Sequence, residues 1–98
     1  MGALMAISFG MRVTVSADVI TRRLDEELIL LDLDSENYFG LDEVGTRMWE
    51  VLSSAPSVQA AFDQLLSEYD VDAGRLHIDL EKLVSELLEH GLVRLQAD

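Results

Sequence analysis

The sequence of 98 residues contains no cysteine and one proline. Without cysteine, disulfide bonds, thiolate catalysis and cysteine-based zinc or iron–sulfur sites are excluded. The apolar runs are short, such as Leu28–Leu31, and fall far below the roughly 18 to 20 residues that a membrane-spanning helix needs. The apolar residues 1–7 follow no basic segment and are too few for the core of a signal peptide. We therefore expect a protein that spans no membrane and acts in the cytoplasm.

Positive charge is also scarce. Seven Lys and Arg stand against nineteen Asp and Glu, which gives a net charge of −12. Residues 1–24 carry Arg12, Arg22 and Arg23 against Asp18, a net charge of +2, so residues 25–98 carry −14. Most of such a surface repels a phosphate backbone but does not repel a basic or neutral peptide. We therefore expect no nucleic acid among the partners.

The composition that remains is that of a globular domain. Hydrophobic residues make up 49% of the chain and charged residues 27%, which is typical of a folded protein rather than a disordered one. A chain of this length buries roughly two thirds of its unfolded surface around one core. We therefore expect residues 1–98 to form a single domain, and we find no internal repeat or linker.

The first half of the chain has the pattern of β-strands. Residues 19–24 are rich in β-branched side chains and residues 28–33 are apolar except for Asp32, with a polar break between the two segments, which predicts a hairpin. Turn-forming residues 34–37 then precede a short third strand at 38–41. Residues 11–15 alternate in a way that suits either a further short strand or an extended lead-in.

From Asp42 onward the apolar period becomes helical. Asp42 or Glu43 begins the first predicted helix, Ser57 is the expected N-cap of the second, and the third runs from about Ala73 to Glu89 before a C-cap at His90–Gly91. Three strands followed by three helices predict an α+β domain. In it, helices cover one side of a three-stranded antiparallel sheet, a winged-helix-like arrangement.

The chain offers few groups for catalysis or metal binding. His77 and His90 are thirteen positions apart on the predicted third helix, which is more than three turns, so the two cannot share a metal ion. We expect surface or capping roles for both. Asp70, Asp72 and Glu81 match parts of a calcium-binding loop, but the middle of the pattern is wrong. No phosphate-binding glycine loop, serine nucleophile elbow or HExxH motif occurs. We expect no enzyme, no metal and no cofactor.

Peptide binding is the remaining hypothesis, because an edge strand offers unpaired N–H and C=O groups to an extended partner. Gly40 in the predicted third strand suits the close approach of another backbone, although a bulge or turn explains it equally well. Ile78 lies about 160° from the centre of the apolar stripe of the third helix, at 100° per residue. It is either a ligand contact or a stray surface isoleucine. Its flank carries Arg75, Asp79, Lys82 and Glu86, with Leu83 at the boundary.

Several segments together resemble the PqqD-like family across about residues 12 to 95. They are Val15–Val19, Leu30–Leu33, Tyr38–Gly45, Met48–Trp49 and Glu89–Val93. The Tyr-Phe-Gly-Leu-Asp stretch is most similar to the stand-alone members encoded with lasso-peptide maturation enzymes. The resemblance implies a recognition element for ribosomally synthesised and post-translationally modified peptides (RiPPs). Such a protein is not catalytic: it holds the leader segment of a precursor peptide and delivers it to a maturation enzyme.

The resemblance also implies where the leader binds. It would add as a strand to residues 37–41 and lie in a groove beside the third helix. The implied peptide-binding residues are Asn37, Tyr38, Phe39, Gly40, Leu41, Arg75, Ile78, Asp79, Lys82, Leu83 and Glu86.

Two alternatives share parts of this pattern. A lasso pathway implies a separate leader peptidase as the second partner, whereas a PqqD-type peptide chaperone would serve a radical-SAM enzyme. A winged-helix DNA-binding protein is the rival from another class. It is disfavoured because the predicted third helix has two basic residues against four acids.

Overall fold

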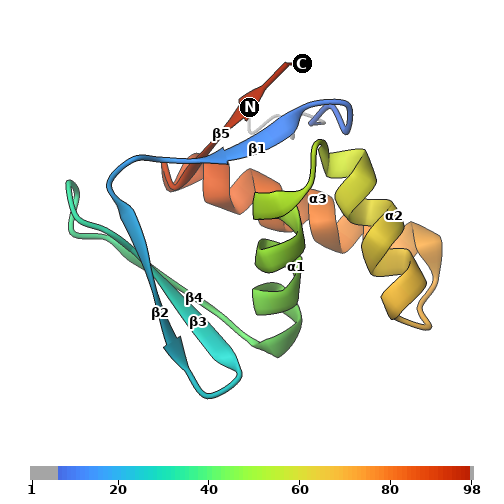
Figure 1. The fold of residues 1–98 in the computed structure, drawn as a ribbon, viewed down its shortest axis with the longest axis horizontal. Helices are drawn as coiled ribbons and strands as arrows, with labels where there is room; N and C mark the ends of the chain where they lie inside the picture. The colour runs from blue at the N-terminus through green and yellow to red at the C-terminus, as the bar shows by residue number, and fades with distance from the viewer. Residues whose placement is uncertain (1–6, 98) are drawn as a thin grey trace, which may run out of the picture.

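The computed structural model describes residues 7–97, which form two antiparallel sheets and three helices (Figure 1). Most of the apolar N-terminal stretch considered above therefore lies outside the described residues. The elements in chain order are β1 (Arg12–Val15), β2 (Val19–Leu24), β3 (Glu27–Asp32), β4 (Tyr38–Leu41), α1 (Glu43–Ser54), α2 (Val58–Glu68), α3 (Ala73–Glu89) and β5 (Val93–Gln96). The predicted α+β class, with a three-stranded antiparallel sheet and three helices, is confirmed.

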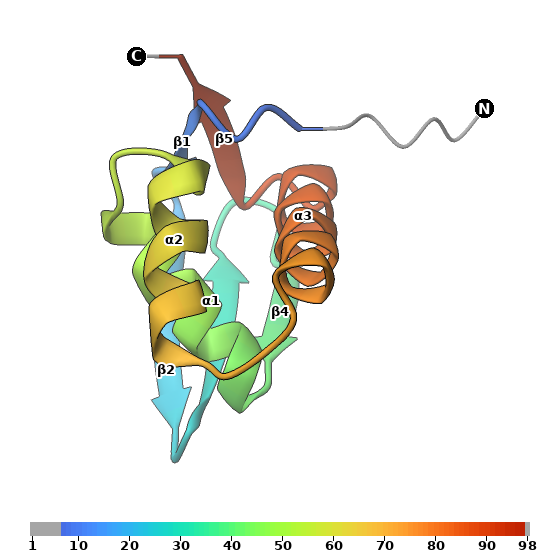
Figure 2. The same cartoon turned by 90° about the vertical axis from the view of Figure 1, so that its right-hand side faces the viewer.

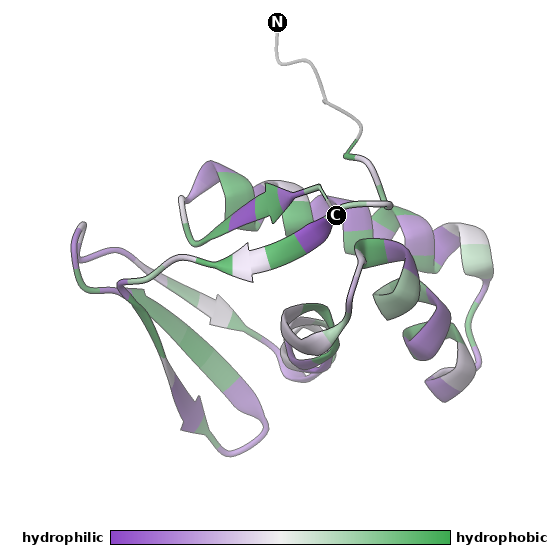
Figure 3. Cartoon of the chain, turned by 45° about the horizontal axis from the view of Figure 1, so that its top comes forward, coloured by the Kyte–Doolittle hydropathy of each residue, from purple (hydrophilic) through white to green (hydrophobic). Residues whose placement is uncertain are grey.

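The three-stranded sheet is a meander with the order β2–β3–β4. Leu30 of β3 lies opposite Thr21 of β2 and Phe39 of β4. β3 is hydrophobic along most of its length (Figure 3), and its Leu28 and Leu30 are buried against the helices. The turn before β4 is held by the Asp32 carboxylate, which accepts hydrogen bonds from its own turn. The sheet therefore forms where strand propensity and turn residues predict it.

A second sheet pairs β1 with β5, so that the first and last strands lie side by side (Figure 1). Residues 12–15 are thus a strand and not an extended lead-in. The sequence did not predict this pairing, because the two strands lie at opposite ends of the chain and no local signal selects a partner at that distance.

Local capping explains where the helices begin. Asp42, Ser57 and Asp72 are the N-caps of α1, α2 and α3, and each side chain accepts a hydrogen bond from a backbone N–H in the first turn. After α3, Gly91 has a φ of +72°, the left-handed conformation that ends many helices.

The core lies between the helices and the inner faces of both sheets. Its fully buried side chains are Leu30, Leu52, Leu65, Leu80, Leu87, Leu92, Val51, Val58 and Val84. α1 lies against the inner face of the meander, α2 packs against α1, and α3 packs against α2 on the β4 side of the domain (Figures 1 and 2). None of the helices in residues 7–97 combines the length and the apolar character that a bilayer crossing requires.

Candidate functional site

The backbone of β4 is paired on one side only, because β4 is an outer strand of its sheet. A backbone N–H of β3 donates to the Asn37 carbonyl with an N···O distance of 2.9 Å. In an antiparallel pair, every second residue directs its backbone N–H and C=O toward the partner strand, so those of Phe39 and Leu41 also face β3. Those of Tyr38 and Gly40 point outward, where no strand in the described part of the chain lies. The two residues together present two N–H donors and two C=O acceptors to a further strand.

The side chains of β4 alternate between the two faces of the sheet. Leu41 is 5% exposed and belongs to the core, and half-buried Phe39 packs against it. Tyr38 is 70% exposed on the opposite face. Gly40 pairs with Ile29 in an unbroken register, so no bulge explains this glycine. A Cβ atom at Gly40 would meet nothing within 4 Å, so the space beside it is open.

An aromatic contact connects β4 to the C-terminal end of α3. The rings of Phe39 and His90 lie 5.1 Å apart at 61° in an edge-to-face arrangement. The Nδ1 atom of His90 lies 2.8 Å from the Glu86 carbonyl, which can only accept, so Nδ1 donates. The capping role expected for His90 is confirmed. Figure 2 shows β4 as the strand of the meander nearest α3.

This contact places His90, at the C-terminal end of α3, beside β4. At 100° per residue, Asp79, Leu83 and Glu86 lie within about 40° of His90 around the helix axis. The side chain of Leu83 is only 8% exposed and packs mainly into the core. The structure thus brings the C-terminal end of α3 into contact with Phe39 of the predicted strand Asn37–Leu41.

The other α3 residues that the family resemblance implied lie farther from His90 around the helix axis. By the same rotation Arg75 is about 60° from His90, Lys82 about 80° and Ile78 about 120°. Ile78 is 62% exposed, so its predicted position out of phase with the core is confirmed. Arg75 forms an ion pair with Asp79, with an N···O distance of 3.3 Å. A ligand that contacts Ile78 must therefore reach across the surface of α3.

His77 has a contact that the sequence did not predict. Its ring stacks on Phe9, with centroids 4.2 Å apart and planes 7° apart, and it also touches the edge of Phe62. This cluster fastens the segment before β1 to α2 and α3. No three His, Asp or Glu side chains in residues 7–97 are placed to hold a metal ion. Asp72, one residue of the weak calcium pattern, is instead the N-cap of α3.

A network of charges lies away from this edge, between β2, α1 and α2. Arg47 donates to both carboxylate oxygens of Glu68, with N···O distances of 2.8 and 2.6 Å. These hydrogen bonds lower the pKa of Glu68 to about 2 and raise that of Arg47. Glu50 accepts from Arg23 and from Arg47, and its pKa is lowered by the same two contacts. The network ties β2 to the helices.

The start of α1 has a pKa shift in the opposite direction. The Glu43 carboxyl shares a hydrogen bond with Glu26 in the β2–β3 turn, and the repulsion between the two carboxylates adds to the effect. Both contributions raise the pKa of Glu43.

The fold and this edge define an α+β domain whose three-stranded sheet has an unpaired outer strand, β4, beside its third helix. The chain belongs to the PqqD family: the family model described as coenzyme PQQ synthesis protein D matches residues 27–93. The family resemblance that the sequence segments indicated is confirmed.

Two solved structures are similar over most of the chain. One is TbiB1 in complex with the TbiA(beta) leader peptide, which is 33% identical with a TM-score of 0.77, covering 87% of this chain and 99% of that one. The other is a lasso peptide synthetase B1 complexed with the leader peptide, at 24% identity and a TM-score of 0.76, covering 85% and 98%. The second likeness supports the fold alone. A comparison with curated proteins gives no match.

Proposed function

We propose that this protein is a RiPP recognition element, which binds the leader segment of a precursor peptide and presents it to a maturation enzyme. The proposal rests mainly on the open edge of β4, where the backbone groups of Tyr38 and Gly40 point outward beside α3. A leader in extended conformation would continue the sheet as a further strand. Main-chain pairing of this kind needs neither a metal nor a cofactor, and the protein's role is recognition rather than catalysis.

Three observations support the proposal. The open edge coincides with the strand that the family resemblance implied. TbiB1, 33% identical to this chain, is described in complex with a leader peptide. The net charge of −12 suits a neutral or basic peptide and opposes a phosphate backbone, which disfavours the winged-helix DNA-binding alternative.

The pathway is the second part of the proposal. The Tyr-Phe-Gly-Leu-Asp stretch at residues 38–42 favours a lasso-peptide pathway with a separate leader peptidase as partner. The match to the PqqD model keeps a radical-SAM enzyme as the alternative partner. In either case we expect the protein to act in the cytoplasm, where a ribosomally made precursor first becomes available.

A titration with a fluorescent leader tests the proposal. The leader is taken from a short precursor encoded beside this chain, and a scrambled peptide of the same composition is the control. We expect saturable anisotropy for the correct leader, unchanged by EDTA, and none for the scrambled one. If saturating protein leaves the anisotropy of the correct leader unchanged, leader recognition is wrong.

The maturation partner is tested in a second experiment. The protein is mixed with a tagged leader peptidase, or a tagged radical-SAM enzyme, encoded in the same neighbourhood, with and without leader. Retention by the peptidase supports the lasso pathway, and retention by the radical-SAM enzyme contradicts it.

A further inference from the structure

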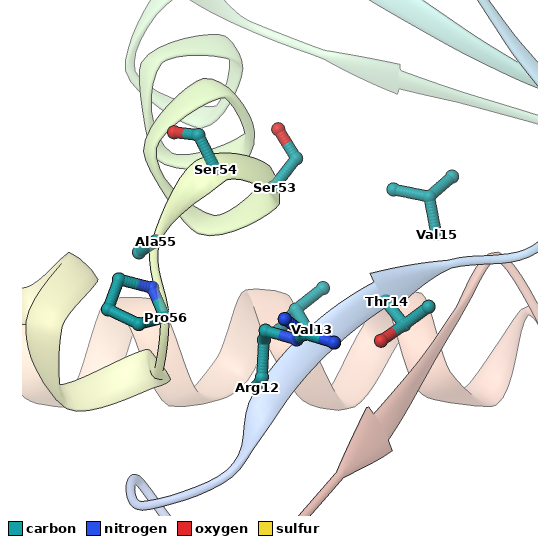
Figure 4. Close-up of a pocket in the computed structure, with 8 residues that line it drawn as sticks. All are labelled: Arg12, Val13, Thr14, Val15, Ser53, Ser54, Ala55 and Pro56. Atoms are coloured by element: carbon teal, nitrogen blue, oxygen red, sulfur yellow. The ribbon is translucent and has the colours of Figure 1, made fainter. Parts of the chain in front are cut away.

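Two clefts of this surface lie away from the open edge of β4. One, of about 510 Å³, lies between β1 and the turn at 53–56 and is lined by Arg12 (Figure 4). The other, of about 250 Å³, lies between the β2–β3 turn and α1, where Arg23 and Arg47 are already paired with Glu50. Neither of these clefts is lined by a residue of β4. The selection of leader side chains at this edge therefore depends on the two faces of its sheet.

Gly40 is a residue of β4 that the packing of residues 7–97 does not explain. It lacks the positive φ that favours glycine. Its register with Ile29 is unbroken, and no atom beyond its chain neighbours lies within 4 Å of the place where a Cβ would be. A glycine inside a strand costs stability, because it has no side chain to pack and loses more backbone freedom on folding than other residues. Such a glycine often marks a position that a ligand approaches closely.

The face of the sheet to which Gly40 belongs is apolar, although the helices lie on the other face (Figures 1 and 2). Leu30 of β3 is fully buried, so its neighbours Ile29 and Leu31 point to the opposite face, here called the outer face. On the outer face Tyr38 lies beside Leu31, and Gly40 lies beside Ile29. The outer face of an antiparallel sheet is commonly polar, so these apolar side chains form a candidate contact surface.

The missing side chain of Gly40 leaves a notch in the outer face. The backbone groups of Gly40 point away from β3, and residues paired in this way lie closest together, so Ile29 stands directly behind the notch. Ile29 is half-buried, and its side toward the edge is uncovered. Tyr38 flanks the notch two residues along β4. The nearest charged positions on this face are farther away, because Arg22 lies on β2 beyond Ile29 and Glu27 lies two residues along β3. The notch is therefore lined by apolar groups.

We propose that Gly40 is a specificity-determining position, where the notch accepts one large apolar side chain of the leader. This inference rests on the proposed function, because the leader must first add to β4 as a strand. The leader residue level with Gly40 then points its side chain to the outer face, whichever way the leader runs. A long aromatic or aliphatic side chain reaches across a glycine to the next strand, where it covers Ile29 and packs beside Tyr38. A charged side chain would lose its hydration there without gaining a partner.

An alanine scan of the leader tests the notch. Each residue of the leader encoded beside this chain is changed singly to alanine, and each peptide is titrated by fluorescence anisotropy into wild type and into Gly40→Val. This variant keeps its N–H and fills the notch. We expect one large apolar leader residue whose change to alanine weakens binding to wild type at least about tenfold, but binding to Gly40→Val no more than about threefold.

A second pair of variants tests the wall of the notch without touching the edge. Ile29→Ala removes the wall, and its matched control Ile20→Ala makes the same change on the same face in the neighbouring row. The critical alanine leader should bind Ile29→Ala no more than about threefold more weakly than the original leader does, whereas the difference should stay near tenfold in Ile20→Ala. Circular dichroism must show that all three variants keep their helices.

The outcomes separate the notch from leader recognition itself. Lysine at the critical leader position should weaken binding at least as much as alanine, and undiminished binding of the lysine leader would overturn the apolar preference. If the leader binds wild type but no leader residue couples to Gly40 and Ile29, the notch is wrong and leader recognition stands. If the leader does not bind wild type, both proposals fail.

Discussion

The two outer strands of the meander differ in how their edges are protected. On β2, the backbone groups of Thr21 and Arg23 point outward, and the Arg23 side chain bonds to Glu50 on α1. On β4, the outward positions are Tyr38 and Gly40, with no charged side chain within the strand. Charged residues on edge strands are a common defence against unwanted strand pairing. The same sheet therefore has one edge guarded by charge and one open edge, and our proposal assigns leader binding to the open one.

The largest expected effect comes from closing the open edge. Gly40→Pro removes an outward N–H and puts the proline ring where an added strand would pair, while the bonds to β3 do not use this N–H. We expect leader affinity to fall by at least about 100-fold, or roughly 2.7 kcal/mol. Anisotropy titration measures the loss, and circular dichroism must show that the helices are retained.

Two matched variants sharpen this comparison. Thr21→Pro removes an outward N–H from β2 and should leave leader affinity within about threefold of wild type, because the guarded edge takes no strand. Gly40→Ala keeps the N–H and places its methyl group in open space, so it should also bind. Wild-type-like binding by Gly40→Pro would mean that the docking strand lies elsewhere, and loss of binding in Thr21→Pro would point to β2.

The sequence predicted those features of the fold that depend on neighbouring residues. Strands 19–24 and 38–41 and the N-cap Ser57 were predicted correctly, because side-chain period and capping are local signals. The partner of β1 was not predicted, because choosing β5 depends on how the helices bring the chain ends together. The stacking of Phe9 on His77 was missed for the same reason.

The candidate site, like the fold, was predicted only in part. The strand and the helix came from the family resemblance, and the exposure of Ile78 came from helical period. The sequence did not show that Tyr38 and Gly40 point outward while Phe39 faces β3, because that requires the pairing register. Nor did it show where α3 meets the strand, which the contact between Phe39 and His90 reveals.

Leu83→Ala should produce the largest loss of stability among the site variants. Leu83 is 8% exposed and lies on the same side of α3 as His90, the residue that contacts β4. We expect the free energy of unfolding to fall by about 2 to 5 kcal/mol, as for other buried leucines cut to alanine. Urea denaturation measures this change. Leu88→Ala, at a half-buried position of the same helix, is the control and should cost less. A loss below about 1 kcal/mol at Leu83 would show that its side chain is not part of the core.

Ile78→Asp tests how far the binding surface extends around α3. The side chain is exposed, so the free energy of unfolding should stay within about 0.5 kcal/mol of wild type. Leader affinity should fall about three- to tenfold if the groove reaches this residue, because the new carboxylate is costly to desolvate beside an apolar leader side chain. Val71→Asp adds the same charge at another exposed apolar position and should not weaken binding. Unchanged affinity makes Ile78 a stray surface residue, and lost stability means that the helix phase is wrong.

The smallest expected effect concerns the network of charged side chains that joins β2 to α1 and α2. Glu68 has a pKa of about 2 in the folded protein, below its ordinary value of 4.5, because Arg47 donates to it. A lowered pKa means that the pair stabilises the fold above about pH 4.5, and that this contribution is lost as the pH falls toward 2.

Arg47→Gln removes the ion pair with Glu68 and the hydrogen bond to Glu50. Its Tm should therefore lie below that of wild type at pH 7, and the gap should narrow between pH 4.5 and pH 2. The raised pKa of Glu43 makes the fold less stable as the pH rises. This effect is present in both wild type and Arg47→Gln, so it cancels in the difference between their Tm values. At pH 7 leader affinity should not change, because the network holds β2 and not β4. A gap in Tm that stays constant with pH would show that Arg47 acts by packing rather than by charge.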